Sequence, residues 1–277
     1  MPDHPLTSVG GGGVIVEAEG PLGERGGWST VASLSTERAL LAAAEAGGLV
    51  YAIGGEDSGG NTLTSVEEYD PETDTWSSVA SLSTAREDLA AAEADGLVYA
   101  IGGRDSDFND VASVEEYDPE TDTWSSVASL STARYRLAAA EAGGLVYAIG
   151  GQDPDNNTLA SVEEYDPETD TWSTVESLST EREHLAAAEA GGLVYAIGGQ
   201  DSGGIELTSV EELTFESFAD VYSATGDTLF GIDDPNGTLL NRTTGQEITG
   251  GDLIARDSET IAAFTEKQAR VYRTEET

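Results

Sequence analysis

The residues best suited to hold a ligand follow an arginine that recurs along the chain. After Arg38, Arg86, Arg134 and Arg182 come the pairs Ala39-Leu40, Glu87-Asp88, Tyr135-Arg136 and Glu183-His184. Tyrosine and arginine are common binding anchors, and an arginine can hold a carboxylate through two parallel hydrogen bonds. These pairs therefore predict a binding surface. The alternative for Arg136 is an ion pair with a neighbouring carboxylate. The four arginines themselves occur in every repeat, which favours a structural role in which they bridge neighbouring repeats. The alternative is a positive ring that attracts an anion.

A second variable segment follows a recurring pair of glycines. Its four versions are EDSGGNTLTS, RDSDFNDVAS, QDPDNNTLAS and QDSGGIELTS, which begin at residues 56, 104, 152 and 200. Arg104 and Phe108 in the second version are further candidates for ligand contact. The aspartate at the second position of each segment could hold a calcium or magnesium ion. We expect it instead to cap its own turn, and we predict neither a metal site nor a cofactor.

A Ser-His-Asp set could be assembled around His184, but no motif in the sequence supports a set of catalytic residues. There is no cysteine, so thiolate metal sites and cysteine nucleophiles are excluded. The two histidines, His4 and His184, share no repeat context, and no GxSxG motif supports a serine nucleophile. We therefore predict no catalytic residues and expect the protein not to be an enzyme.

The chain contains four tandem repeats of 48 residues. Trp28, Trp76, Trp124 and Trp172 mark them, and AAAEAGGLVYAIGG recurs verbatim from Ala42, Ala138 and Ala186 and, with Asp95 as the one change, from Ala90. Each repeat predicts four short strands: LAAAEA, LVYAIGG, SVEEYDP and WSSVASL. The double glycine, the Tyr-Asp, the Trp and the Arg ten residues after that Trp resemble the kelch motif over about residues 28–213. The resemblance implies an all-β, kelch-type β-propeller of four-stranded antiparallel blades.

The ends of the chain depart from the motif, since Leu213 replaces the fourth tyrosine and no tryptophan follows it. We predict a single domain over residues 1–277, with six blades favoured and five as the alternative. VIVEAEG (14–20) and WSTVASL (28–34) are expected to be strands three and four of a blade that C-terminal strands complete. The C-terminal candidates are DVYSA, TLFGID, GTLLN, DLIAR, TIAAFT and ARVYR. A separate small C-terminal domain is a third option.

In an antiparallel blade, strand two ends on the side where strand one begins. The variable pairs and the variable loops should therefore meet at one end of the propeller, opposite the nearly invariant AGG and PETD turns. Binding residues commonly lie on loops of a rigid scaffold, so this end is the expected binding face. Neutral drift of the loops is the competing explanation.

The charge limits the partners. The chain has 53 acidic against 12 basic residues, a net charge of −41, which disfavours nucleic acids and anionic membranes. The composition resembles that of proteins from extreme halophiles, in which molar salt screens the self-repulsion. No apolar run or leader segment stands out. We therefore expect a monomer in a high-salt cytoplasm, with export as the alternative.

Three functions compete on this evidence. The first is a non-catalytic module that binds a protein or glycan on the variable face. The second is a small-molecule enzyme or receptor at the channel mouth, using the arginines with Glu87, Glu183 or His184. Kelch oxidases require a cysteine, which is absent, and the catalytic residues of kelch sialic acid mutarotases cannot be matched. The third is an array of duplicated repeats without an evolved ligand.

Overall fold

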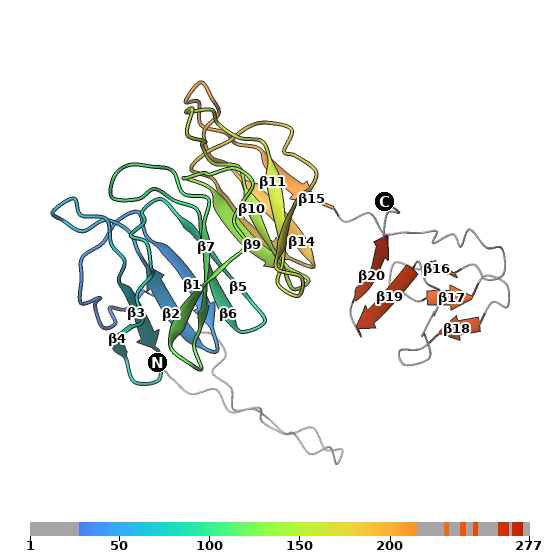
Figure 1. Cartoon of the computed structure of the whole chain (residues 1–277), viewed down its shortest axis with the longest axis horizontal. Helices are drawn as coiled ribbons and strands as arrows, with labels where there is room; N and C mark the ends of the chain where they lie inside the picture. Colours follow the sequence, from blue (N-terminus) through green and yellow to red (C-terminus); the bar gives the residue numbers. More distant parts are fainter. Residues whose placement is uncertain are drawn as a thin grey trace, which may run out of the picture. The chain divides into compact units, whose positions relative to one another are not determined.

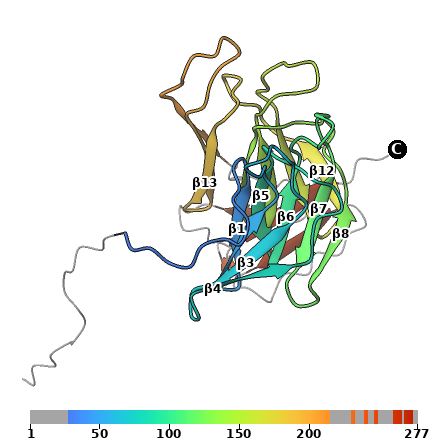
Figure 2. The ribbon, with the colours of Figure 1, turned by 90° about the vertical axis from the view of Figure 1, so that its left-hand side faces the viewer.

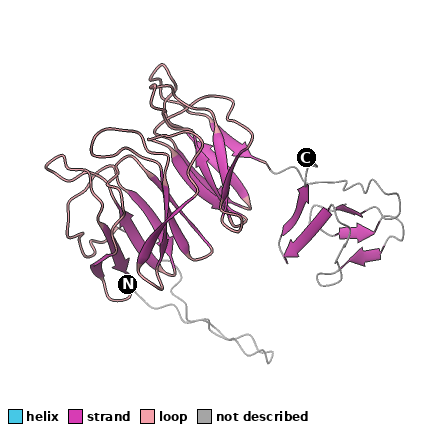
Figure 3. Ribbon diagram, viewed as in Figure 1, coloured by secondary structure: helices cyan, strands magenta, loops and turns pink. Residues whose placement is uncertain are grey.

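The computed structural model describes residues 28–214 and five strands between residues 230 and 273. By its contacts the chain divides into two units, Met1–Ala32 and Ser33–Thr277. The four repeats lie in the second unit. The described residues contain strands, turns and loops but no helix (Figure 3), and therefore no helix that could cross a membrane.

Each of the first three repeats forms a four-stranded antiparallel sheet with its strands in sequence order. The first blade comprises β1 (Ala42–Ala46), β2 (Leu49–Ile53), β3 (Val66–Asp70) and β4 (Thr75–Val79). The second comprises β5 (Ala90–Ala94), β6 (Leu97–Ile101), β7 (Val114–Asp118) and β8 (Thr123–Val127). The third comprises β9 (Ala138–Ala142), β10 (Leu145–Ile149), β11 (Val162–Asp166) and β12 (Thr171–Thr174). The fourth has three strands, β13 (Ala186–Ala190), β14 (Leu193–Ile197) and β15 (Val210–Leu213).

These sheets confirm the predicted all-β propeller architecture with four-stranded blades. The turns behave as the sequence predicts: Asp95 and Gly96 between β5 and β6 have φ angles of 53° and 84°, as a tight hairpin requires. The loops between the second and third strands project from the upper end of the blades in Figure 1, and the short hairpins lie at the lower end. The variable segments therefore share one end, as expected.

The recurring arginine bridges consecutive blades. Arg86 lies in the crossover from β4 to β5, and its amide donates to the Leu63 carbonyl of the first blade (3.1 Å). Its guanidinium donates to the carbonyls of Gly102 (3.1 Å) and Ser113 (2.9 Å) and to the Glu115 carboxylate (2.7 Å) in the second blade. The same ion pair recurs as Arg38–Glu67, Arg134–Glu163 and Arg182–Glu211. The structural role is confirmed. The alternative of a positive ring is wrong, because all four guanidinium side chains are 0% exposed.

The double glycine makes room for this crossover. Gly54 has a φ of +60°, and a Cβ atom there would lie 2.5 Å from the Arg86 carbonyl oxygen. The position therefore requires glycine for two reasons, its left-handed backbone and the close approach of the next blade.

The hydrophobic core lies between blades rather than within one. Tyr51 of β2 meets Tyr117 of β7 edge to face, with ring centroids 5.5 Å apart. Trp124 packs on Tyr117 and donates its indole N–H to the Ala80 carbonyl of the preceding blade (2.9 Å). Each repeat therefore completes its core only by stacking on its neighbour.

The ends of the chain differ from the prediction. WSTVASL (28–34) is not a strand, and Trp28 is fully exposed. Its expected partner VIVEAEG lies outside the described residues. The described residues form four blades, so the six-blade prediction is not met, and ring closure by the termini is not seen among them. Among the described residues the fourth blade has three strands, and its sequence lacks the Tyr and Trp that the other three blades carry on their third and fourth strands.

The C-terminal strands form two small sheets. One contains β16 (Phe230–Ile232), β17 (Leu239–Asn241) and β18 (Gln246–Ile248), and the other contains β19 (Thr260–Thr265) and β20 (Gln268–Arg273). Four of the six predicted segments overlap these strands, while DVYSA and DLIAR lie outside the described residues. The strand β18 was not predicted. Neither sheet has the four strands of a blade.

Candidate functional site

Four residues, one from the start of each blade, form an open arc at one end of the described blades, and we call them the mouth ring: Leu40, Asp88, Arg136 and His184. Each follows by two positions one of the recurring arginines Arg38, Arg86, Arg134 and Arg182, which we call the clamp arginines. Each has a left-handed backbone with φ between 50° and 54°. A ladder of backbone hydrogen bonds of 2.9 Å joins them, from the amide of each residue to the carbonyl of the preceding one. The ladder fixes the backbone, so that different side chains are presented from equivalent positions.

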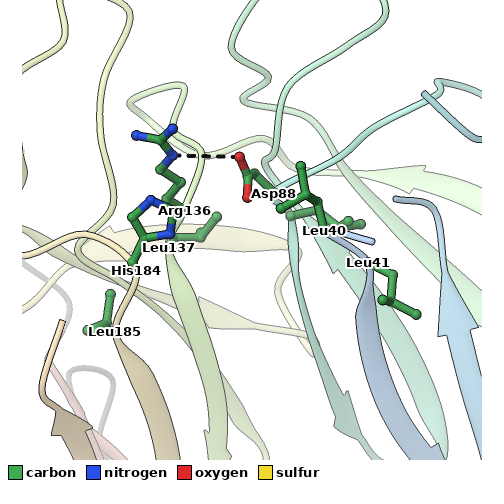
Figure 4. A pocket seen from close by; sticks show the side chains of 8 residues that line it. Leu40, Leu41, Asp88, Arg136, Leu137, His184 and Leu185 are labelled. Atoms are coloured by element: carbon green, nitrogen blue, oxygen red, sulfur yellow. Dashed lines mark ion pairs between the residues drawn. The ribbon is translucent and has the colours of Figure 1, made fainter. Parts of the chain in front are cut away.

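The mouth ring lines a shallow cavity. Its volume is ≈ 220 Å³, and a leucine that follows each ring residue forms its wall: Leu41, Leu89, Leu137 and Leu185. Figure 4 shows Arg136 and Asp88 facing each other across the opening, with His184 beside Arg136. A cation, a carboxylate and an imidazole therefore meet at one cavity, and three of its four wall leucines, Leu89, Leu137 and Leu185, are themselves buried. The variable pairs of the sequence include all four of these residues of the mouth ring, but the sequence did not indicate the leucines of the wall.

Arg136 is held by two carboxylates. Its Nη1 atom lies 3.1 Å from a Glu183 oxygen and its Nε atom lies 3.6 Å from an Asp88 oxygen. The side chain is still 31% exposed, so solvent weakens these pairs. The ion-pair alternative for Arg136 is thus correct, and it leaves part of the guanidinium open to the solvent.

In three of the four variable pairs the first member is buried and the second is not, whereas Ala39 and Leu40 are both exposed. Glu87, Tyr135 and Glu183 are between 3% and 8% exposed. The backbone at these positions forms an isolated bridge with the residue after the double glycine, such as Tyr135 with Gln152. The Tyr135 hydroxyl also donates to the Gln152 side chain. Burial leaves Tyr135, Glu87 and Glu183 little surface for a ligand, and their direct contact with one stays a prediction.

The two loop candidates, Arg104 and Phe108, have different surroundings. The Arg104 guanidinium lies 3.5 Å from the centre of the Tyr135 ring and bonds to Asp110 (3.0 Å), so it supports the wall between the second and third blades. Phe108 is 72% exposed and has a φ of 62°. The equivalent residues are Gly60, Asn156 and Gly204. A bulky residue rarely adopts this left-handed backbone. Phe108 therefore combines a strained backbone with an exposed aromatic side chain.

A contact between two carboxyl groups lies beside the mouth ring. Burial, reinforced by a hydrogen bond with Glu56 and by its charge, raises the pKa of the Glu87 carboxyl. The Thr62 hydroxyl, 3.4 Å away, opposes this rise as a donor. The sequence did not predict a role for Glu56. Its position directly after the double glycine, equivalent to that of Arg104, is the signal that could have pointed to this residue.

The repeated loop aspartates cap their turns, as expected. The Asp57 carboxylate accepts hydrogen bonds from the amides of Gly59 (2.8 Å) and Asn61 (2.9 Å). Bonds from Asn61 and Gly59 lower the pKa of this carboxyl. Asp105, Asp153 and Asp201 accept equivalent bonds. In the described part of the chain, no three metal-binding side chains of His, Cys, Asp or Glu come together.

Comparison with known proteins agrees with this architecture. Residues 40–222 match the family described as the KLHDC2/KLHL20/DRC7 kelch-repeats domain. The match covers more than half of the 277 residues, so the chain belongs to this kelch-repeat family. Among solved structures, that of YjhT is similar with a TM-score of 0.52 and 14% identity, over 74% of this chain and 85% of that one. This likeness supports the fold alone. No curated protein matches the sequence significantly.

Proposed function

We propose that this protein is a non-catalytic binding module whose protein or glycan ligand contacts the mouth ring and the loops around it. One observation carries the proposal. Where the blades are otherwise nearly identical, their differences gather on one end, and the mouth ring presents leucine, aspartate, arginine and histidine from the same backbone position. A rigid frame with varied side chains suits recognition.

The shape of the mouth favours a ligand that lies across it. Pockets that enclose small molecules commonly measure about 300–1,000 Å³, and the cavity here is ≈ 220 Å³. The exposed Phe108 on a neighbouring loop offers an apolar contact outside the cavity. A large ligand can reach both, and aromatic and arginine side chains are typical anchors of such contacts.

A small-molecule enzyme or receptor is the second candidate. It is favoured by the meeting of Asp88, Arg136 and His184 over one cavity, because these side chains supply an acid, a cation and an imidazole. A ligand of this kind would depend on the mouth ring but not on Phe108. The two candidates therefore differ in which variants weaken binding.

Variants that copy one repeat into another provide a sharp test. Arg136→Leu and His184→Leu place the first blade's Leu40 side chain on the same backbone, and Phe108→Gly copies Gly60. Asp95→Gly, at the opposite end, turns the one divergent hairpin into the common sequence and serves as the control. Proteins retained from extracts in about 3 M KCl are identified by mass spectrometry, and a glycan array is probed in the same buffer.

We expect a defined ligand to bind wild type and Asp95→Gly alike. It should bind about tenfold or more weakly to the Arg136→Leu/His184→Leu double variant and more weakly to Phe108→Gly. Loss with the ring variants but not with Phe108→Gly would favour the small-molecule candidate. Equal binding by all variants would refute the proposed site.

A further inference from the structure

The last blade exposes a face that every other blade buries. Ile197 is 40% exposed, whereas its equivalents Ile53, Ile101 and Ile149 are at most 2% exposed. Val210 is 56% exposed, whereas Val66, Val114 and Val162 are at most 4% exposed. In the first three blades this face packs on the next blade. We call it the forward face.

The first blade exposes the opposite face, which we call the rear face. Ala43 is exposed and Val50 is half-buried. Their equivalents in the second blade, Ala91 and Val98, pack into the core shared with the first blade. The described array therefore ends in two different apolar surfaces, a forward face that is largely exposed and a rear face that is partly exposed.

The forward face of blade four and the rear face of blade one have the same residues as two faces that already pack on each other within the chain. The forward face of blade four repeats residue by residue the face that blade one packs on blade two: Ala186, Ala188, Ala190, Tyr195, Ile197 and Val210 in place of Ala42, Ala44, Ala46, Tyr51, Ile53 and Val66. The rear face of blade one likewise carries Leu41, Ala43, Val50, Ala52, Tyr69 and Trp76 in place of Leu89, Ala91, Val98, Ala100, Tyr117 and Trp124.

We propose that these faces bind each other between copies of the chain, with blade four of one copy packed against blade one of the next. Such a contact repeats the Tyr51–Tyr117 junction as Tyr195 against Tyr69. It also continues the backbone ladder, from the His184 carbonyl of one copy to the Leu40 amide of the next. Among the described residues, only another copy of these repeats carries the matching surface. The proposal goes beyond the proposed function, since it uses other residues.

The interface joins two different faces, so it is head to tail, and copies associate into a closed ring or an open chain. Each copy carries a net charge of −41, so association requires salt that screens the repulsion. This assembly would replace the monomer expected from composition.

Two variants and their mixture test the arrangement. Ile197→Asp spoils the forward face and Ala43→Asp the rear face, and both side chains are exposed in the single chain, so the fold should survive. Mass is followed by sedimentation over about 1–100 µM protein in about 3 M KCl, with near-UV circular dichroism as the check of folding. Phe108→Asp, away from both faces, is the control.

We expect wild type and Phe108→Asp to reach the mass of two or more copies as concentration rises, while each face variant stays a monomer. An equal mixture of Ile197→Asp and Ala43→Asp should form dimers and nothing larger, because it contains one intact forward face and one intact rear face per pair. Folded wild-type protein that stays monomeric throughout would overturn the proposal. So would a mixture that remains monomeric, since that excludes head-to-tail contact.

Discussion

Two arginines that lie two positions apart, Arg134 and Arg136, have opposite roles in the same crossover. Arg134 is completely buried and bonds to the carbonyls of Gly150 (3.0 Å) and Ser161 (3.1 Å) and to the Glu163 carboxylate (2.6 Å). Arg136 faces the mouth with part of its guanidinium exposed. The first position is arginine in every repeat, and the second is a different residue in each.

The difference shows how the crossover separates structure from recognition. The clamp arginine and the backbone ladder hold the path of the chain, with bonds that do not involve the side chain of the mouth ring residue. That side chain can therefore change without loss of the fold. The same backbone supports Leu40, Asp88 and His184 in the other blades.

The largest effect that we predict is loss of the folded state at low salt, which would remove both the contacts of Arg134 and the surface around Arg136. In about 0.1 M KCl the screening length is about 10 Å, against about 3 Å at 1 M, so a net charge of −41 should expand the folded chain. We expect near-UV circular dichroism to disappear as KCl falls well below about 1 M and to return when salt is restored. A full signal in about 0.1 M KCl would contradict the view that acidity is an adaptation to salt.

The second prediction compares the two arginines directly. Arg134→Leu leaves the buried Glu163 carboxylate without its partner, which typically costs about 3–5 kcal/mol of unfolding free energy. Arg136→Leu removes partly exposed ion pairs and should change stability by about 1 kcal/mol or less. Urea unfolding of both variants in about 3 M KCl gives the two values. Similar losses for the two variants would show that the mouth ring is part of the structural frame.

The repeat made most of the fold predictable from sequence. Four copies of one pattern fixed the strands, the hairpins and the end at which the variable segments meet. The repeat also indicated a structural role for the clamp arginine, because Arg134 has an arginine at the equivalent position of every repeat while the two residues after it vary. The ends were harder: WSTVASL has the residue pattern of a strand, but residues 28–34 form no strand in the structure. A residue pattern alone does not decide whether a segment joins a sheet.

The candidate site was predicted only in part. The sequence located the variable pairs but did not show which member of each pair faces the mouth. That orientation depends on the backbone bridge between the first member and the residue after the double glycine. The sequence therefore predicts that Tyr135 contacts a ligand, and in the structure the guanidinium of Arg104 lies over the Tyr135 ring. The carboxyl contact of Glu56 with Glu87 joins two blades, so local sequence did not reveal it.

The smallest predicted effect concerns that carboxyl contact. Because burial and the neighbouring Glu56 raise the pKa of Glu87 in the folded protein, ionised Glu87 destabilises the fold at neutral pH. The penalty falls as the pH drops through the folded pKa, and it is gone near the unfolded value of about 4.3. Glu87→Gln should therefore stabilise the protein at about pH 7.5 by about 0.2–1 kcal/mol, the usual cost of adjacent like charges. The gain should vanish near pH 4.5.

The matched control for Glu87 is the equivalent residue of the fourth blade. Glu183 is equally buried but lies beside Arg136 (3.1 Å) rather than beside a carboxylate. Glu183→Gln should therefore give no gain at about pH 7.5 and a small loss. Urea unfolding of both variants at the two pH values in about 3 M KCl measures the difference. If Glu87→Gln were no more stable than wild type at pH 7.5, the carboxyl groups of Glu56 and Glu87 would not repel each other. The surroundings of Glu87 and Glu183 would then not differ in their effect on stability.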